Sequence, residues 1–423
     1  MDKNNNLSEF IILADVPPIA SAEHLKKYAE AGFTYYNLTE DYVTRNNSDG
    51  KISDEYYAAI DRAHKAGLKV LLRTMNANSV DYYDGITDEF NGKVEGFYIA
   101  DEPSCFDVDW YGSCSLDELE KQVKWYNAHG GNTLFHVNLL QNYGMELVHG
   151  KNAPKYSDYL DAYIEKVLKK VNGKKTLSTD HYPLAKDENG NFIKESAIGD
   201  YYLIAERSKA LREQGHDVIT SFCIQLIYDT GLLLRLPVCA EDVFFQTNFA
   251  MAFGSKMLEF FQYAGDEYGA VIDQKNQTTF TPVYDWIKIA NERVHSLEKF
   301  ILPYDWNKTA VSRGYEVSDA HNLKAFNSVA EFQPDKFEKL SLFESSADAV
   351  ISEFVKDKNK YAYMAVNYTE PTAGISNTVK LKFNGEKCIT VIKEGFIVVE
   401  KSVCKDITVT LAAGEAVFVT IED

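Results

Sequence analysis

The stretch "GFYIADEPS", residues 96–104, ends an apolar run with two neighbouring carboxylates and then a proline. Proline has no backbone N–H, so it cannot continue the hydrogen-bond ladder of a buried strand. The stretch therefore predicts a strand that ends at Asp101 and Glu102. Two acids at such an end are either a solvated turn or part of a functional site.

Seven similar β-rich runs surround this one within the first 265 residues, and amphipathic segments lie between most of them, as at 53–66, 115–129, 156–171 and 200–214. With it, the runs are "FIILADV" from 10, "TYYNLTED" from 34, "KVLLRTM" from 69, "VEGFYIAD" from 94, "TLFHVNLL" from 133, "TLSTDHYP" from 176, "VITSFCIQL" from 218 and "KMLEFFQYA" from 256. Strands that alternate with helices imply parallel pairing. Eight such units predict an α/β fold, a closed (β/α)₈ TIM barrel.

Residues that typically begin and end helices lie where this fold requires them. Ser115 and Glu118 form a capping box at the start of the 115–129 segment. Glycines in "KAGLKV", "AHGGNT", "VNGKKT" and "EQGHDV" stand where a helix ends and a strand begins. The first strand is followed by "ADVPPIAS" rather than a GxGxxG motif, which argues against a dinucleotide-binding sheet.

The pattern changes after a last helical segment at 281–300. Alternating strands follow without long helices, as in "DAVISEFV", "YAYMAVNY" and "FIVVEKS". We therefore expect a barrel domain over residues 1–302 and an antiparallel β-sandwich domain over 303–423, joined by the linker "LPYDWNKT".

Composition narrows the classes of partner. The chain has 44 basic and 63 acidic residues, a net charge of −19, which disfavours nucleic acid and anionic membranes as partners. Its six cysteines lack metal-ligand spacing, and we expect free thiols. The start "MDKNNNLSEF" resembles no signal sequence, so the expected location is the cytoplasm, or outside the cell if a signal peptide has been removed. The sequence leaves the oligomeric state open.

Functional residues of such barrels lie at the C-terminal ends of the strands. Strand alternation predicts that Phe97 and Ile99 face the helices, whereas Tyr98, Ala100 and Glu102 face inward. Glu102 is then at the barrel mouth, with Asp101 aimed sideways beside it.

Two further acids are candidates for the same mouth. On the sixth strand Asp180 and Tyr182 should face inward beside His181. On the eighth strand Glu259 should point into the barrel, because burying it against the apolar helix layer is costly. Glu259 lies early in its strand and is also explained by a buried ion pair, with Arg73 as a partner.

Eight βα units, the "ADEP" motif and a C-terminal β-sandwich resemble the clan A glycoside hydrolases, whose fourth strand commonly ends in Asn-Glu-Pro. The segment 235–264 and the C-terminal "AAGEAVFVTI" also resemble such proteins. The resemblance implies that Glu102 is the general acid/base and that no metal or organic cofactor is needed. The family's nucleophile is a glutamate on the seventh strand, where this chain has "ITSFCIQL" with Gln225. Asp180, and after it Glu259, are the expected substitutes as catalytic carboxylates.

The implied activity is hydrolysis of an O-glycosidic bond in a neutral oligosaccharide or polysaccharide. Polar residues at strand ends are expected to bind sugar hydroxyls, and aromatic side chains on the following loops to stack on sugar rings. The expected substrate-binding residues are Asp101, Asp41, His136, Asn138, His181, Tyr182 and Gln225, and Asp15 is a further strand-end candidate. Trp110, Tyr143 and Tyr228 are the loop candidates for stacking, and Asp229 and Arg235 are weaker candidates.

Two alternatives stay open at this point. The missing glutamate on the seventh strand fits a degenerate barrel that binds glycans without cleaving them. A metal-dependent barrel hydrolase would use histidines such as His136 and His181, but the first strand has no HxH motif.

Overall fold

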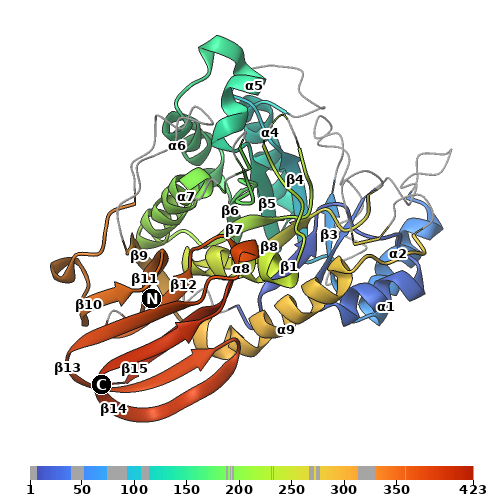
Figure 1. The fold of residues 1–423 in the computed structure, drawn as a ribbon. Helices are drawn as coiled ribbons and strands as arrows, with labels where there is room; N and C mark the ends of the chain where they lie inside the picture. The colour runs from blue at the N-terminus through green and yellow to red at the C-terminus, as the bar shows by residue number, and fades with distance from the viewer. Residues whose placement is uncertain are drawn as a thin grey trace.

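The computed structural model describes residues 7–39, 52–73, 93–105, 114–130, 132–186, 195–229, 233–265, 277–312, 329–357 and 359–422, together with residues 189, 190, 192, 231, 271 and 272. Eight parallel strands form one sheet, and helices surround it (Figure 1). The strands are β1 (Ile11–Ala14), β2 (Tyr35–Leu38), β3 (Lys69–Arg73), β4 (Gly96–Asp101), β5 (Leu134–Leu139), β6 (Lys175–Thr179), β7 (Val218–Gln225) and β8 (Ser255–Phe261). Each coincides with one of the eight predicted runs.

The sheet closes into a barrel. Its order is β1-β8-β7-β6-β5-β4-β3-β2, so β1 and β2 are the strands that must meet. They do so through the backbone N–H of Thr34, which donates to the Ile12 carbonyl at 2.9 Å, and the Asn37 amide, which donates to the Asp15 carbonyl at 3.2 Å. The predicted (β/α)₈ barrel is therefore confirmed.

Eight α-helices are described along the chain, and several begin at side-chain caps. Ser21, Ser53 and Ser115 accept a backbone N–H at the first turn of α1, α2 and α4, and Ser115 forms the predicted capping box with Glu118. The helices are α1 (Ala22–Glu30), α2 (Asp54–Lys65), α4 (Leu116–His129), α5 (Met145–His149), α6 (Tyr156–Lys166), α7 (Glu195–Glu213), α8 (Ala240–Ala252) and α9 (Val283–Ile301). None of them is long and apolar enough to cross a membrane.

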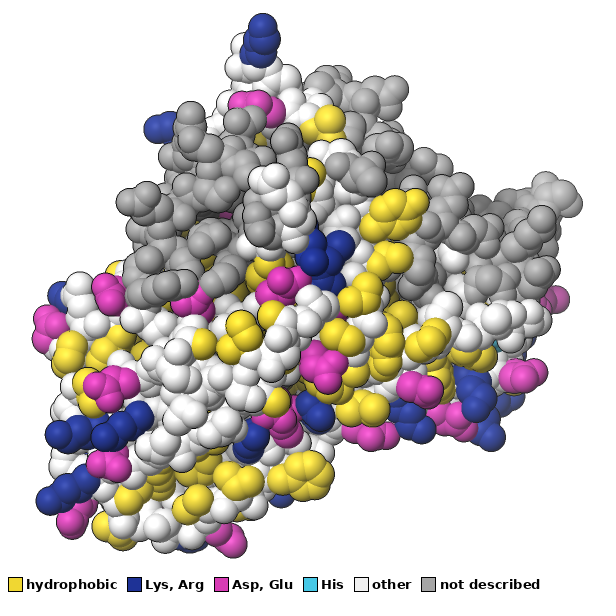
Figure 2. Space-filling model, viewed as in Figure 1, with side chains coloured by type: hydrophobic (Ala, Val, Ile, Leu, Met, Phe, Trp, Pro, Cys, Tyr) yellow, Lys and Arg dark blue, Asp and Glu magenta, His cyan; other side chains and the backbone are white. Residues whose placement is uncertain are grey.

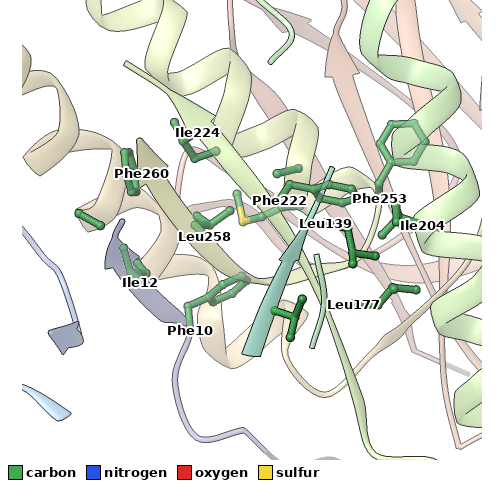
Figure 3. Close-up of a cluster of buried hydrophobic side chains, with 14 of the residues drawn as sticks. Phe10, Ile12, Leu139, Leu177, Ile204, Phe222, Ile224, Phe253, Leu258 and Phe260 are labelled. Carbon is green, nitrogen blue, oxygen red and sulfur yellow. The ribbon is translucent and has the colours of Figure 1, made fainter. Parts of the chain in front are cut away.

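Two apolar layers hold the barrel. The larger one lies between strands and helices, where Phe222 and Ile224 from β7 and Leu258 and Phe260 from β8 pack together (Figure 3). The smaller one fills the barrel interior with Ile11, Leu13, Tyr35, Leu71, Leu134, Ile219 and Met257. Most of these residues precede the last residues of their strands, which leaves the C-terminal ends for polar side chains.

The C-terminal region forms a seven-stranded antiparallel sheet with its own core, as expected for a β-sandwich. Its strands are β9 (Asp305–Val311), β10 (Leu340–Ser345), β11 (Ala349–Lys356), β12 (Lys360–Asn367), β13 (Asn377–Lys393), β14 (Phe396–Leu411) and β15 (Ala416–Glu422). The expected linker at 302–309 was wrong, because β9 begins within it and pairs with β11. The domain boundary near residue 302 stays a prediction.

Candidate active site

A cavity of about 300 Å³ opens at the C-terminal ends of the barrel strands. Its walls include Asn138, Gln141, Tyr182, Cys223 and Phe261. Six carboxyl side chains also line it, namely Asp15, Asp101, Glu102, Asp180, Asp229 and Glu259. The ring of Tyr182 stacks on that of Phe261, with centroids 6.3 Å apart. The cavity is thus an acidic site with one aromatic wall.

A register shift in β4 decides which of its residues face this cavity. Tyr98 pairs with His136 and Ala100 with Val137, so Ile99 is an extra residue in the ladder. The prediction that Ala100 faces inward was therefore wrong, and Ala100 packs in the outer layer. Asp101 instead points inward, where its Oδ1 accepts hydrogen bonds from the Tyr98 hydroxyl (3.1 Å) and the Asn138 amide (3.0 Å).

Glu102 follows the end of β4 and has an unusual backbone. Its N–H donates to the Asn138 carbonyl at 2.9 Å, and its φ angle is +44°. Side chains other than glycine rarely adopt this left-handed region, which costs about 1–2 kcal/mol. The residue is half-buried and lines the cavity. Strain of this kind collects where a fold must hold a side chain in one place.

Gln141 joins Glu102 to Asp180. Its amide is oriented by its partners, because only the NH₂ group can donate to two carboxyl oxygens. In that orientation Nε2 lies 3.0 Å from Asp180 Oδ1 and 3.0 Å from Glu102 Oε1. The ends of β4, β5 and β6 thus meet at one amide.

The carboxyl groups of Asp180 and Glu102 lie close together, because each has an oxygen 3.0 Å from the same Gln141 nitrogen. Burial, followed by the charges of Glu102 and Asp101, raises the pKa of Asp180 well above its usual range. Carboxyl groups this close titrate as a pair, because the charge on Glu102 raises the pKa of Asp180.

Arg73 supports the acidic floor of the cavity from β3. Its guanidinium forms an ion pair with Asp15 and donates to Asp101 Oδ2 at 3.1 Å. It also stacks 4.4 Å from the Tyr98 ring centroid. The side chains of Arg73 and Asp15 are less than a tenth exposed. These contacts fix Asp101 and neutralise part of the buried charge.

Glu259 points into the barrel, and its hydrogen-bonding partner is His136 rather than Arg73. His136 Nε2 lies 3.1 Å from Glu259 Oε2, and His136 Nδ1 lies 2.8 Å from the Thr176 hydroxyl. Glu259 Oε1 is buried and has no hydrogen-bond partner among the described residues. Glu259 also lines the cavity.

The remaining predicted residues divide into three groups. Asn138 and Tyr182 line the cavity, and His136 lies beneath it. His181 and Gln225 are buried but do not line it: His181 bonds to Asp200, and the amide of Gln225 bonds to backbone groups that include Leu184. Asp41 and Trp110 lie outside the described residues.

The other candidates also differ in whether they line the cavity. Asp15 and Asp229 line the cavity, whereas Arg235 forms a two-pronged ion pair with Asp242 on α8 at 2.7 and 2.6 Å. Tyr143 packs edge-on against His181, and Tyr228 is exposed. Sequence reasoning missed Gln141 and Cys223. Only their positions in the sequence could have identified them, because Gln141 follows the end of β5 and Cys223 lies near the end of β7.

Within the described part of the chain, no group of three His, Cys, Asp or Glu side chains is arranged to hold a metal ion.

Comparison with known proteins gives fold but not family. No protein-family model matches the sequence. No curated protein matches it either.

Solved structures do match. A catalytic mutant of Gan42B, a GH42 β-galactosidase from G. stearothermophilus, superimposes with a TM-score of 0.58 at 8% identity, covering 99% of each chain. A family 39 glycoside hydrolase from Bacteroides cellulosilyticus gives 0.53 at 12% identity, covering 98% of this chain and 81% of that one. A conserved exported protein from Bacteroides fragilis gives 0.51 at 10% identity, covering 97% of both. The resemblance to barrel glycosidases is thus confirmed at the level of the fold.

Proposed function

We propose that the protein is a glycoside hydrolase that cleaves an O-glycosidic bond of a neutral oligosaccharide or polysaccharide with the carboxyl pair Glu102 and Asp180. One observation carries the proposal: the two side chains are joined by a bridging amide, Gln141, whose nitrogen lies 3.0 Å from an oxygen of each, at the mouth of the barrel. Glycoside cleavage needs one protonated and one ionised carboxyl group, which is the state that such a pair holds.

The division of roles follows from position. Glu102 directly follows β4, the place of the general acid/base in the barrels that this chain resembles, so we assign it the delivery of the proton to the leaving oxygen. Asp180 is the second carboxylate, and it attacks the sugar or assists its departure. Because Glu102 Oε1 and Asp180 Oδ1 each lie 3.0 Å from one nitrogen, these oxygens are at most twice that distance apart. This fits the separation of about 5 Å that retaining enzymes use better than the wider one of inverting enzymes. We therefore propose retention of configuration.

The charge of the cavity favours an uncharged substrate. Six carboxyl groups line the cavity, and the nearby Arg73 is already paired with Asp15 and Asp101, so we expect uronic acids and sulfated sugars to be repelled. Neutral sugars instead offer hydroxyl groups to Asp101 and Asn138, which line the cavity. The proposed reaction uses no metal and no organic cofactor. Nucleic acid and membranes are not proposed as partners.

The proposal is tested with the purified protein and a panel of neutral and acidic glycans and aryl glycosides. We expect turnover of at least one neutral glycoside, retained stereochemistry in the first product seen by NMR, and no turnover of uronides. Glu102→Gln and Asp180→Asn should lose activity, whereas Glu344→Gln, an exposed glutamate on β10, should not. Activity that chelation abolishes and zinc restores would contradict the proposal.

A second candidate function rests on β7. Cys223 is the β7 side chain that lines the cavity, and the resemblance places a nucleophilic glutamate on this strand in clan A enzymes. A barrel that binds glycans without cleaving them fits that difference. Saccharide binding without turnover across the whole panel would favour it.

A further inference from the structure

A buried carboxylate on α7 connects two segments of the candidate active site without touching the cavity. Asp200 is 1% exposed. Its Oδ2 accepts the backbone N–H of Asn142 at 3.3 Å and is hydrogen-bonded to Nδ1 of His181. Asp200 is absent from the cavity lining, so it has no direct contact with a substrate there.

Both partners adjoin residues of the site. Asn142 follows Gln141, and His181 follows Asp180. One carboxylate oxygen therefore holds both the segment after β5 and the segment after β6. The two side chains that these segments carry are those that meet at Glu102, with Gln141 Nε2 3.0 Å from each carboxyl group.

Fold stability alone explains this carboxylate poorly. A fully buried carboxylate is costly unless all its oxygens are satisfied. Asp200 Oδ1 has no hydrogen-bond partner among the described residues, and the same holds for Nε2 of His181. Packed apolar side chains in place of both Asp200 and His181 would avoid this cost. The contribution of Asp200 is therefore to the positions of the two segments that it binds.

We propose that Asp200 is the positioning residue of the site, which sets Gln141 and Asp180 in register against Glu102. This inference rests on the proposed function for its effect on rate, but its structural part stands without it. A misplacement of a reacting group by about 1 Å can cost on the order of 10²-fold in rate. Loss of Asp200 should thus act on kcat more than on KM.

Two substitutions separate position from charge. In Asp200→Asn, the amide oxygen can take the place of Oδ2 and accept both hydrogen bonds, while its NH₂ takes the place of the unpartnered Oδ1. Asp200→Leu keeps similar bulk and removes both bonds. We expect Asp200→Asn to retain kcat within about 3-fold, and Asp200→Leu to lower it by about 10–100-fold with KM within about 3-fold.

Two further variants serve as controls for this interpretation. His181→Phe removes the donor from the other end of the bond, so it should reproduce the loss, and the double variant His181→Phe/Asp200→Leu should be no worse than either single one. Asp242→Asn changes an equally buried helix carboxylate, whose partners Arg235 and Val238 do not line the cavity, and should cost stability with little change in kcat.

The deciding measurement is a crystal structure of each Asp200 variant and of His181→Phe. In Asp200→Leu, or in His181→Phe if the former does not fold, we expect Gln141 Nε2 to lose its contact with Asp180 or Glu102, and in Asp200→Asn to keep both. If both contacts persist in the variants without the bond, the positioning role is overturned, whatever the activity. If the wild-type protein turns over no glycan, the proposed function fails while this structural outcome still decides the role of Asp200.

Discussion

Glu102, the proton donor that we propose, has a backbone φ angle of +44°. The fold pays for this conformation through the surrounding contacts, including the hydrogen bond from Glu102 N–H to the Asn138 carbonyl at 2.9 Å. The acid at this position was readable from the sequence because a strand end, a carboxylate and a proline coincide there. Its positive φ angle could not be predicted from the sequence, because no neighbouring residue favours that conformation.

The strain can be measured with two variants that both lack the carboxylate. Glu102→Gly relieves the left-handed backbone and Glu102→Ala keeps it, so the glycine variant should be more stable by about 1 kcal/mol. Urea denaturation of both proteins checks this. An alanine variant that equals or exceeds the glycine variant in stability would show that the backbone is not strained.

Asp180 gives a second prediction at this scale. Its pKa is raised in the folded protein, so the folded state binds its proton more tightly than the unfolded chain does, where the pKa is about 4. The associated stability is present below pH ~4 and is lost as the pH rises through the raised pKa. Asp180→Asn has no such proton and should be more stable than wild type at pH 8. Thermal melting from pH 4 to 8 should show this advantage shrink toward pH 4, and an advantage independent of pH would contradict the shift.

At the scale of elements, the strands and most helices could be predicted because their apolar periodicity is set by local sequence. The register shift in β4 could not, because it depends on how Tyr98 and Ala100 pair with β5. The inward position of Asp101 follows from that shift. The contacts of Glu259 with His136 on β5, and of Gln141 with two other strand ends, are likewise products of barrel closure.

Arg73 ties β3 to the ends of β1 and β4, which makes it a test of this closure. Removing it in Arg73→Leu leaves the buried carboxylate of Asp15 without its partner and should destabilise the protein by about 3–5 kcal/mol. Most of the loss comes from Asp15, because the Asp101 side chain is 40% exposed. Arg73→Lys keeps the charge without the planar fork and should lose less. Chemical denaturation that places Arg73→Leu within 1 kcal/mol of wild type would contradict this account.

At the scale of the whole molecule, α8 lies between the barrel and the second sheet (Figure 1). Phe249 on α8 stacks on Tyr368 with centroids 5.0 Å apart, and the Asn248 amide donates to the Gly414 carbonyl at 2.8 Å. Gly414 has a φ of +72°, and a Cβ there would lie 2.5 Å from the Glu241 carbonyl, so only glycine fits this contact. The order of the two folds could be predicted from the change in periodicity near residue 303. Their contact could not, because it joins residues far apart in sequence.

The surface of the molecule carries both charged and apolar side chains. Acidic and basic side chains are interspersed on the face shown in Figure 2, and several apolar ones gather toward its lower edge. The exposed large apolar residues include Phe396, Val398 and Val403 of β14. The net charge of −19 belongs to the whole chain, whereas six carboxyl groups are gathered in the cavity.

The central claim is that Glu102 donates the proton during glycoside cleavage, and one measurement tests it most directly. Initial rates of wild type and Glu102→Gln are compared on a series of aryl glycosides of the sugar that the panel identifies, with leaving groups of increasing acidity. Glutamine keeps the shape without the proton, so we expect a loss of about 10²–10⁴-fold for poor leaving groups, a much smaller loss for the most acidic ones, and an unchanged melting temperature. Equal rates of the two proteins across the series, or the same loss for every leaving group, would contradict the account.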